Sequence, residues 1–293
     1  MIKQSSNHEI EGNYYIKNDQ ILALNVNPLN LTNPQPAVYE VIRVMDRTPL
    51  FLEDHLQRLQ HSVNLLGHSH VIEHSALRKQ IHRLIEANQL SNKNLKLLLT
   101  GLYNQQPILY YFFIPSHYPA ESLYQQGVTT ILYTSERNQP NVKAVATEQR
   151  NLINAAIAQA DAYEALLVNQ KQQVTEGSRS NLFVIKDGAL FTPPLGDVLP
   201  GITRSKVISL CKKLHIPLLE KEITVAFLQE AEGIFLTGTS PKVLPIAQVD
   251  QQRFPSPRHP LILDLILGYD QMTENYISTS KASQQINQKS EAD

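Results

Sequence analysis

The sequence predicts a mixed α/β protein with two domains. Its 293 residues exceed what one hydrophobic core usually organises, because single cores stop growing near about 250 to 300 residues. Short apolar runs alternate with amphipathic helical patterns along most of the chain. The segment 115–119 contains two prolines and is followed by polar residues, which is typical of a linker. We therefore expect a smaller N-terminal α/β domain over residues 1–117, a larger domain over 118–277, and a polar tail over 278–293.

The first half has the pattern of a sheet that packs against two helices. Expected strands cover residues 14–16, 21–24, 39–44, 50–52, 95–100 and 108–114. Helices are expected near 53–66 and 75–88, because leucine, isoleucine and valine recur there at spacings of three and four. Residues 25–36 are rich in asparagine and proline and should form a loop.

The second half again mixes strands and helices. Expected strands cover residues 128–133, 164–168, 175–177, 181–185, 189–192, 234–236 and 243–249. Helical patterns occupy residues 152–160, a segment opened by residues 200–204, and residues 260–277. Cys211 is the only cysteine and lies on the apolar side of the second of these helices, so we expect it to be a buried core residue. The tail has too few apolar residues to fold alone.

The composition favours a protein that acts on small soluble molecules. With 26 basic and 27 acidic residues the net charge is −1, which provides no attraction for nucleic acid or an anionic membrane. No apolar run approaches the roughly 18 residues of a membrane span, and the N-terminus has no signal-peptide pattern. We therefore expect a cytoplasmic protein. The histidines form no convincing ligand set, and we expect no metal site.

Three motifs follow one another between Val174 and Arg204. They are E-G-S-x-S-N-L-F from Glu176, L-x-T-P-P from Leu190, and L-P-G-I-T-R from Leu199. The last motif opens a helix, whose first backbone N–H groups form an anion site to which Thr203 adds a hydroxyl.

Together these motifs resemble the class IV aminotransferases, the fold-type IV pyridoxal-phosphate enzymes. The resemblance extends from about Val38 to Ile246. It implies a C-terminal pseudo-barrel domain, pyridoxal 5'-phosphate as cofactor, a homodimer, and transfer of an amino group between an amino acid and a 2-oxo acid. The family also contains aminodeoxychorismate lyases, which eliminate pyruvate at the same kind of site. That reaction is the main alternative.

The resemblance implies that Lys143 is the Schiff-base lysine. It lies about thirty residues before Glu176 and keeps an ungapped distance to Glu164, as in the family. A gapped alignment on Asn151 would instead place Glu148 at that position and leave no lysine. The protein would then bind the cofactor without turnover.

Other roles follow from the same resemblance. Glu176 would hold the pyridine nitrogen protonated, because a nearby anion favours the cationic ring. Tyr39 would face the substrate, although a core aromatic residue is nearly as good an interpretation. The implied phosphate-binding residues are Arg58, Ile202, Thr203, Gly238 and Thr239.

Two departures from the family pattern leave the substrate open. The family's Y-G-D-G turn before Tyr39 is replaced by residues 27–36, so one wall of the substrate site must differ. The strand ending at Thr100 lacks the arginine often found directly after it, which weakens a D-amino-acid interpretation. Nothing singles out branched-chain substrates.

Overall fold

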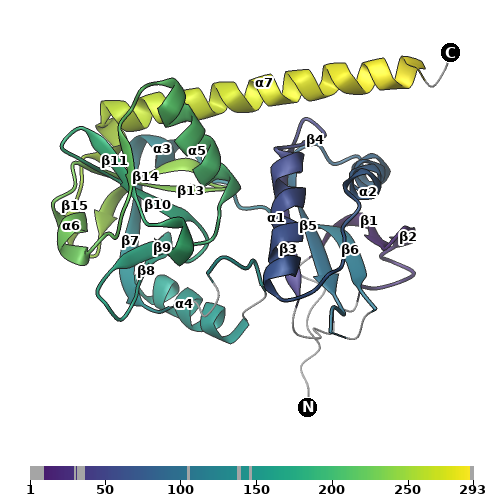
Figure 1. Cartoon of the computed structure of the whole chain (residues 1–293), viewed down its shortest axis with the longest axis horizontal. Coiled ribbons are helices and arrows are strands. Elements are labelled where there is room, and N and C mark those ends of the chain that lie inside the picture. Colours follow the sequence, from purple (N-terminus) through teal and green to yellow (C-terminus); the bar gives the residue numbers. More distant parts are fainter. Residues whose placement is uncertain are drawn as a thin grey trace. The chain divides into compact units, whose positions relative to one another are not determined.

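The computed structural model describes residues 10–29, 31, 37–103, 106–136, 140–144 and 147–290 (Figure 1). These residues divide into two compact units. Unit 1 comprises the described residues within Met1–His117, Val142–Val145 and Thr273–Asp293, and unit 2 those within Tyr118–Asn141 and Ala146–Met272. Residues 142–144 and 273–277, which we expected in the second domain, therefore group with unit 1.

Unit 1 contains an antiparallel sheet and two helices. Its described residues form six strands in the order β2-β1-β6-β5-β3-β4. The elements are β1 (Glu11–Lys17), β2 (Gln20–Ala23), β3 (Val38–Met45), β4 (Thr48–Pro49), α1 (Leu52–Leu65), α2 (His74–Asn88), β5 (Lys93–Thr100) and β6 (Ile108–Ile114). The helices predicted for this half and most of its strands are thereby confirmed. The expected strand 50–52 is instead a turn at residues 50 and 51 followed by the first residue of α1, and the short strand β4 precedes it. Much of the predicted loop 25–36 lies outside the described residues.

The pleat of β3 separates two apolar clusters in unit 1. Alternate residues Val38, Ile42 and Val44 pack with α1 and α2, as expected for a strand with period-two side chains. Tyr39 lies on the opposite side, in a cluster with Leu98 of β5. One face of the strand is thus buried along its length, and the other is buried at Tyr39 and half buried after it, which explains why most of its residues are apolar.

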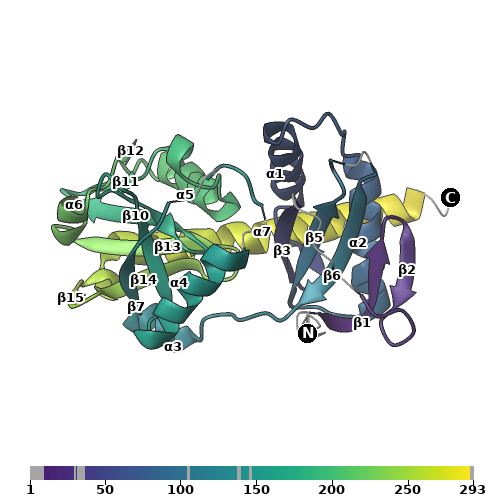
Figure 2. The ribbon, with the colours of Figure 1, turned by 90° about the horizontal axis from the view of Figure 1, so that it is seen from below.

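Unit 2 is built on a curled mixed sheet. Its described residues form nine strands, eight of them in the order β12-β11-β10-β13-β14-β7-β8-β9, with β15 paired to β14. Although β9 and β10 are far apart in that order, they are in contact, so the sheet curls into a half-barrel. Figure 2 shows β10, β13 and β14 side by side within this sheet. The expected fold class, mixed α/β with a pseudo-barrel, is confirmed.

The bounds in unit 2 are as follows. The strands are β7 (Val128–Thr134), β8 (Glu164–Val168), β9 (Val174–Gly177), β10 (Asn181–Lys186), β11 (Ala189–Thr192), β12 (Leu218–Glu220), β13 (Gly233–Gly238), β14 (Lys242–Val249) and β15 (Gln252–Arg253). The helices are α3 (Glu121–Gln126), α4 (Thr147–Gln159), α5 (Ile202–Lys213) and α6 (Val225–Gln229), with 3-10 turns at Leu195–Asp197 and Ser256–Arg258. The short elements α3, α6, β12 and β15 were not predicted, because they carry too few residues for a periodic pattern. Cys211 is buried as expected, and burial raises the pKa of its thiol to about 11.

The last helix, α7 (Pro260–Ser290), is longer than predicted. Residues 278–290 were expected to be a polar tail, but they contain no glycine or proline and include lysine, alanine and glutamine, which favour helix. Two contacts within unit 1 involve this end of the helix: just before residue 278 the Tyr276 hydroxyl donates to Glu53 Oε2 at 2.7 Å, and Lys281 Nζ lies 3.6 Å from Asp46 Oδ2 in an exposed ion pair. Among the described helices, none combines the length and apolar character of a membrane span.

Candidate active site

Glu40 is a buried carboxylate in the middle of the apolar strand β3. Its Oε1 accepts a hydrogen bond from Arg58 Nε at 2.8 Å, and its Oε2 accepts from Arg58 Nη2 at 2.6 Å and from His55 Nδ1 at 2.8 Å. His55 and Arg58 are three residues apart on α1 and therefore share one side of that helix. All three side chains are buried.

The charges of this cluster are balanced. Burial alone would raise the pKa of Glu40, but the charge and hydrogen bonds of Arg58 and the hydrogen bond from His55 lower it to about 2. Burial lowers the pKa of His55 despite the neighbouring carboxylate. A neutral imidazole thus donates its Nδ1–H to an anionic Glu40, which also pairs with Arg58. The bidentate pair fixes the plane of the Arg58 guanidinium.

Lys143 belongs to unit 1 because its segment pairs with β3. The Tyr39 amide donates to the Lys143 carbonyl oxygen at 3.0 Å, and Ala144 forms a β-bridge with Val38. The Lys143 amide makes a long contact of 3.5 Å with Ser62 Oγ, one helical turn beyond Arg58 on α1. Its Nζ lies 4.7 Å from the centroid of the Tyr39 ring.

Three of the predicted site residues, Tyr39, Arg58 and Lys143, thus lie around β3 and α1. Glu148, the alternative to Lys143, is an exposed residue in the first turn of α4 in unit 2. Of these two residues, Lys143 is the one held against the strand that carries Tyr39.

Glu176 is the penultimate residue of β9 in unit 2 and is likewise buried. Its Oε2 accepts hydrogen bonds from the Leu199 amide at 3.1 Å and from Asn181 Nδ2 at 3.5 Å. Asn181 Nδ2 also donates to the Leu199 carbonyl oxygen at 2.9 Å. The carboxylate is therefore held by Asn181 of its own motif and by Leu199 of the third motif, 23 residues after Glu176.

Packing explains two glycines of these motifs. A Cβ at Gly177 would lie 2.6 Å from Glu164 Oε1, and a Cβ at Gly201 would overlap Asn181 Oδ1. Neither glycine has a positive φ. Each leaves room for a buried polar side chain, and any larger residue would displace it.

The remaining predicted residues lie near the same end of the unit 2 sheet. Ile202 and Thr203 open α5 directly after Gly201, which provides no side-chain cap for the first turn, and α5 packs against β13. Gly238 ends β13, where Thr237 is paired with Asn181 of β10. Unit 2 therefore brings together Glu176, Ile202, Thr203, Gly238 and Thr239.

These donors fit pyridoxal phosphate. An uncapped helix start and threonine hydroxyls suit a phosphate, and a buried carboxylate suits a protonated ring nitrogen. In addition, Thr237 Oγ1 is buried and finds no hydrogen-bond partner within the described part of the chain. Such a group is more often satisfied by a ligand or water than left alone.

Sequence reasoning missed Glu40, His55 and Asn181 as parts of the site. A charged residue inside the apolar run of β3 was a usable signal, since a buried carboxylate needs a partner. The H-x-x-R spacing on the following helix pointed to that partner. Asn181 stood within a quoted motif, but nothing in the sequence indicated its contact with Leu199.

Comparisons with known proteins identify the family of this chain. The model of the family "Amino-transferase class IV" matches residues 37–249. A D-alanine aminotransferase of Bacillus licheniformis is 31% identical over 229 residues, which cover 73% of this chain and 79% of that protein. A probable branched-chain-amino-acid aminotransferase of Thermotoga maritima is 29% identical over 222 residues, covering 75% of this chain and 80% of the relative.

Solved structures show the same fold. The branched-chain amino acid aminotransferase of Escherichia coli aligns with a TM-score of 0.81 at 22% identity, over 90% of this chain and 95% of that chain. A putative 4-amino-4-deoxychorismate lyase of Legionella pneumophila aligns with a TM-score of 0.73 at 24% identity, over 80% and 90%. The chain therefore belongs to the class IV aminotransferases, which are pyridoxal-phosphate enzymes of fold type IV.

Proposed function

We propose that this chain is an amino-acid aminotransferase that moves an amino group between an amino acid and a 2-oxo acid, with Lys143 as the lysine that carries the cofactor. The observation behind the proposal is the environment of Lys143. Its backbone is tied to β3, and its Nζ lies 4.7 Å from the Tyr39 ring centroid. The exposed Glu148 has no comparable surroundings and has no amine to offer.

When bound, pyridoxal phosphate supplies a ring that accepts the electrons released at the substrate Cα. Glu176 offers this ring a buried negative charge, and its hydrogen bonds to Leu199 and Asn181 fix its direction. The Lys143 amine serves as the base and acid that moves the proton at the substrate Cα. The Tyr39 ring covers one side of that amine and reduces the access of water.

We assign phosphate binding to Arg58 from unit 1 and to Ile202, Thr203, Gly238 and Thr239 from unit 2. The ion pair with Glu40 supports the role of Arg58, because it holds the guanidinium in one orientation. The role of α5 is supported by its first-turn amides, which point along the helix axis and favour anions. Tyr39 contacts the substrate, and its phenol offers both an apolar ring and a hydroxyl donor.

Aminodeoxychorismate lyase activity is the alternative reaction. The same lysine and carboxylate would serve an elimination. In addition, the sequence lacks the arginine expected directly after Thr100, so a D-amino-acid substrate would miss its expected carboxylate partner. A product assay with aminodeoxychorismate and with panels of L- and D-amino acids separates the two. A keto acid with an aminated cofactor supports the transaminase, and pyruvate with an unchanged cofactor supports the lyase.

Lys143 is tested by borohydride reduction of the cofactor-loaded protein followed by peptide mapping. The pyridoxyl group should be found on Lys143, and Lys143→Ala should lose it while Glu148→Gln keeps it. An adduct on another lysine would refute the assignment. The complete absence of an adduct and of turnover would favour a protein that binds the cofactor without catalysis.

We further propose that the active form is a homodimer, as the family resemblance implies, and that the protein is cytoplasmic. Light scattering of the purified chain should give twice the 33.1 kDa of one chain. A monomeric mass that is retained in the active sample would refute this assembly.

A further inference from the structure

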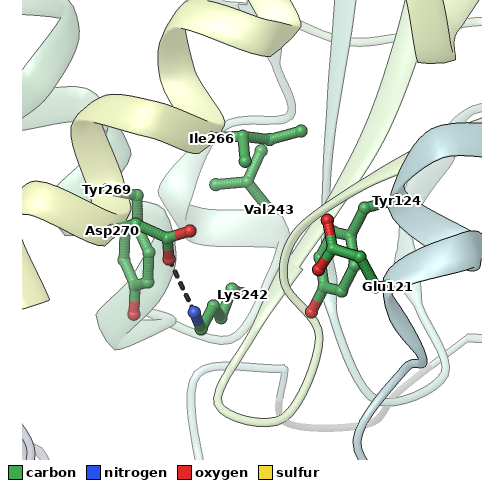
Figure 3. A pocket seen from close by; sticks show the side chains of 7 residues that line it. All are labelled: Glu121, Tyr124, Lys242, Val243, Ile266, Tyr269 and Asp270. Carbon is green, nitrogen blue, oxygen red and sulfur yellow. Dashed lines mark hydrogen bonds and ion pairs between the residues drawn. The ribbon is translucent and has the colours of Figure 1, made fainter.

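Unit 2 contains a small cavity next to the segments to which we assign phosphate binding. It has a volume of about 70 Å³ and is lined by Glu121, Tyr124, Lys242, Val243, Ile266, Tyr269 and Asp270 (Figure 3). Tyr269 and Asp270 are consecutive residues of α7, while Tyr124 and Glu121 come from α3. Two helices therefore approach the strand start at Lys242 from opposite sides of the cavity.

Side chains around this cavity hold the turn that carries Thr239. Tyr124 Oη donates to the Pro241 carbonyl oxygen at 3.1 Å. Lys242 Nζ donates to Asp270 Oδ1 at 2.6 Å, an ion pair that is only partly exposed. The turn is thus fixed at Pro241 and Lys242, two and three residues after Thr239.

Tyr269 contacts the first turn of α5, the other segment to which we assign phosphate binding. Its Oη lies 3.5 Å from Thr203 Oγ1 in the first turn of α5, and both residues are 4% exposed. Adjacent residues of α7 therefore contact both segments, Tyr269 on α5 and Asp270 beside the Thr239 turn.

Gly268 allows this close approach of α7 to α5. A Cβ at this position would lie 2.7 Å from Leu210 Cδ2 of α5. Glycine inside a helix costs about 1 kcal/mol relative to alanine, so its presence calls for a packing reason. The absence of a side chain at Gly268 lets the neighbouring Tyr269 contact Thr203.

We propose that Tyr269 is a positioning residue for the cofactor phosphate, and this inference rests on the phosphate role proposed for Thr203. A phenol is a better proton donor than an aliphatic hydroxyl, since its pKa is near 10. Tyr269 Oη–H therefore donates to Thr203 Oγ1, and the Thr203 hydroxyl hydrogen is left to point at the anion. Two hydrogen bonds in series polarise each other, which strengthens the outer one.

The test compares two Tyr→Phe variants on the same helix in the full chain freed of cofactor. Dissociation constants are measured for pyridoxal phosphate and for pyridoxal, which lacks the phosphate. Tyr269→Phe should weaken pyridoxal phosphate binding about 3- to 10-fold, the effect of one lost hydrogen bond, and leave pyridoxal binding unchanged. Tyr276→Phe, which removes the hydroxyl that contacts Glu53 in unit 1, should change neither constant.

A double-mutant cycle with Thr203→Val checks the route of the effect. If Tyr269 acts through Thr203, then Tyr269→Phe should have no further effect in the Thr203→Val background. Equal losses for both ligands in Tyr269→Phe, or an unchanged preference for pyridoxal phosphate, would overturn the role of Tyr269. A wild-type chain without that preference would instead overturn the phosphate site itself.

Discussion

Replacing Glu40 by glutamine tests the buried cluster of unit 1 most directly. The substitution keeps the shape of the side chain but removes the charge that faces Arg58. A pKa lowered from 4.5 to about 2 corresponds to roughly 3 kcal/mol, because one pKa unit is worth about 1.4 kcal/mol. Removing one partner of a buried ion pair typically costs about 3 to 5 kcal/mol, since the other charge stays buried. We expect Glu40→Gln to lower the free energy of unfolding of unit 1 by about 3 kcal/mol.

The same ion pair predicts how the stability of unit 1 changes with pH. The pKa of Glu40 is lower in the folded state than in the unfolded state, so the stabilisation is complete above about pH 4.5 and is lost as the pH falls towards about 2. The difference between wild type and Glu40→Gln should therefore be largest at neutral pH and shrink below pH 4.5. Because the chain has two units, urea unfolding of the whole chain does not report on unit 1 alone. Amide hydrogen exchange of peptides from β3 and α1 should therefore be measured as well.

Glu53→Gln is the matched control. Glu53 is also on α1 and pairs with Arg78, but the two side chains are 49% and 45% exposed. Exposed ion pairs typically contribute about 0 to 1 kcal/mol. A loss below about 1 kcal/mol for Glu40→Gln, or equal losses for the two variants, would refute the reasoning about the buried charge.

Two further predictions concern unit 2. Gly201→Ala should destabilise the protein by about 1 to 3 kcal/mol in thermal unfolding, because the new methyl group overlaps Asn181, while Gly196→Ala, with open space at its Cβ, should be neutral. Equal melting temperatures for the two variants would contradict this packing argument. Glu176→Gln should lower kcat about 10-fold or more with a smaller change in cofactor affinity, since a neighbouring charge typically shifts a pKa by about 1 to 3 units. Unchanged single-turnover rates on a productive substrate would remove Glu176 from the mechanism.

Much of the fold could be predicted because its signals are local. The helices α1 and α2 repeat apolar residues every three or four positions, and most residues of β3 are apolar because one of its faces is buried and the other is at least half buried. The end of α7 was missed for the opposite reason. Its residues after 277 have no apolar stripe, and contacts such as that of Lys281 with Asp46 join positions far apart in the sequence.

The candidate site was predictable where backbone geometry demands particular residues. Gly177 and Gly201 could be read in the motifs because no other residue leaves room for Glu164 and Asn181. A glutamate has no such unique requirement. Glu40 stands in an apolar run and Glu53 at a helix start, but the sequence alone did not show that Glu40 is buried beside Arg58 while Glu53 is half exposed.

The position of Lys143 illustrates the same limit. Residues 140–144 carry no periodic pattern, so the sequence alone assigned them to the domain that follows the linker. Backbone hydrogen bonding instead joins this segment to β3, about one hundred residues earlier in the chain. A β-bridge uses peptide groups that every residue has, and side-chain chemistry therefore cannot reveal it. We proposed Lys143 as the reactive lysine from its spacing to Glu176, and its backbone is attached to β3, the strand of Tyr39 and Glu40. A change that loosens β3 should therefore disturb Lys143 and Arg58 together.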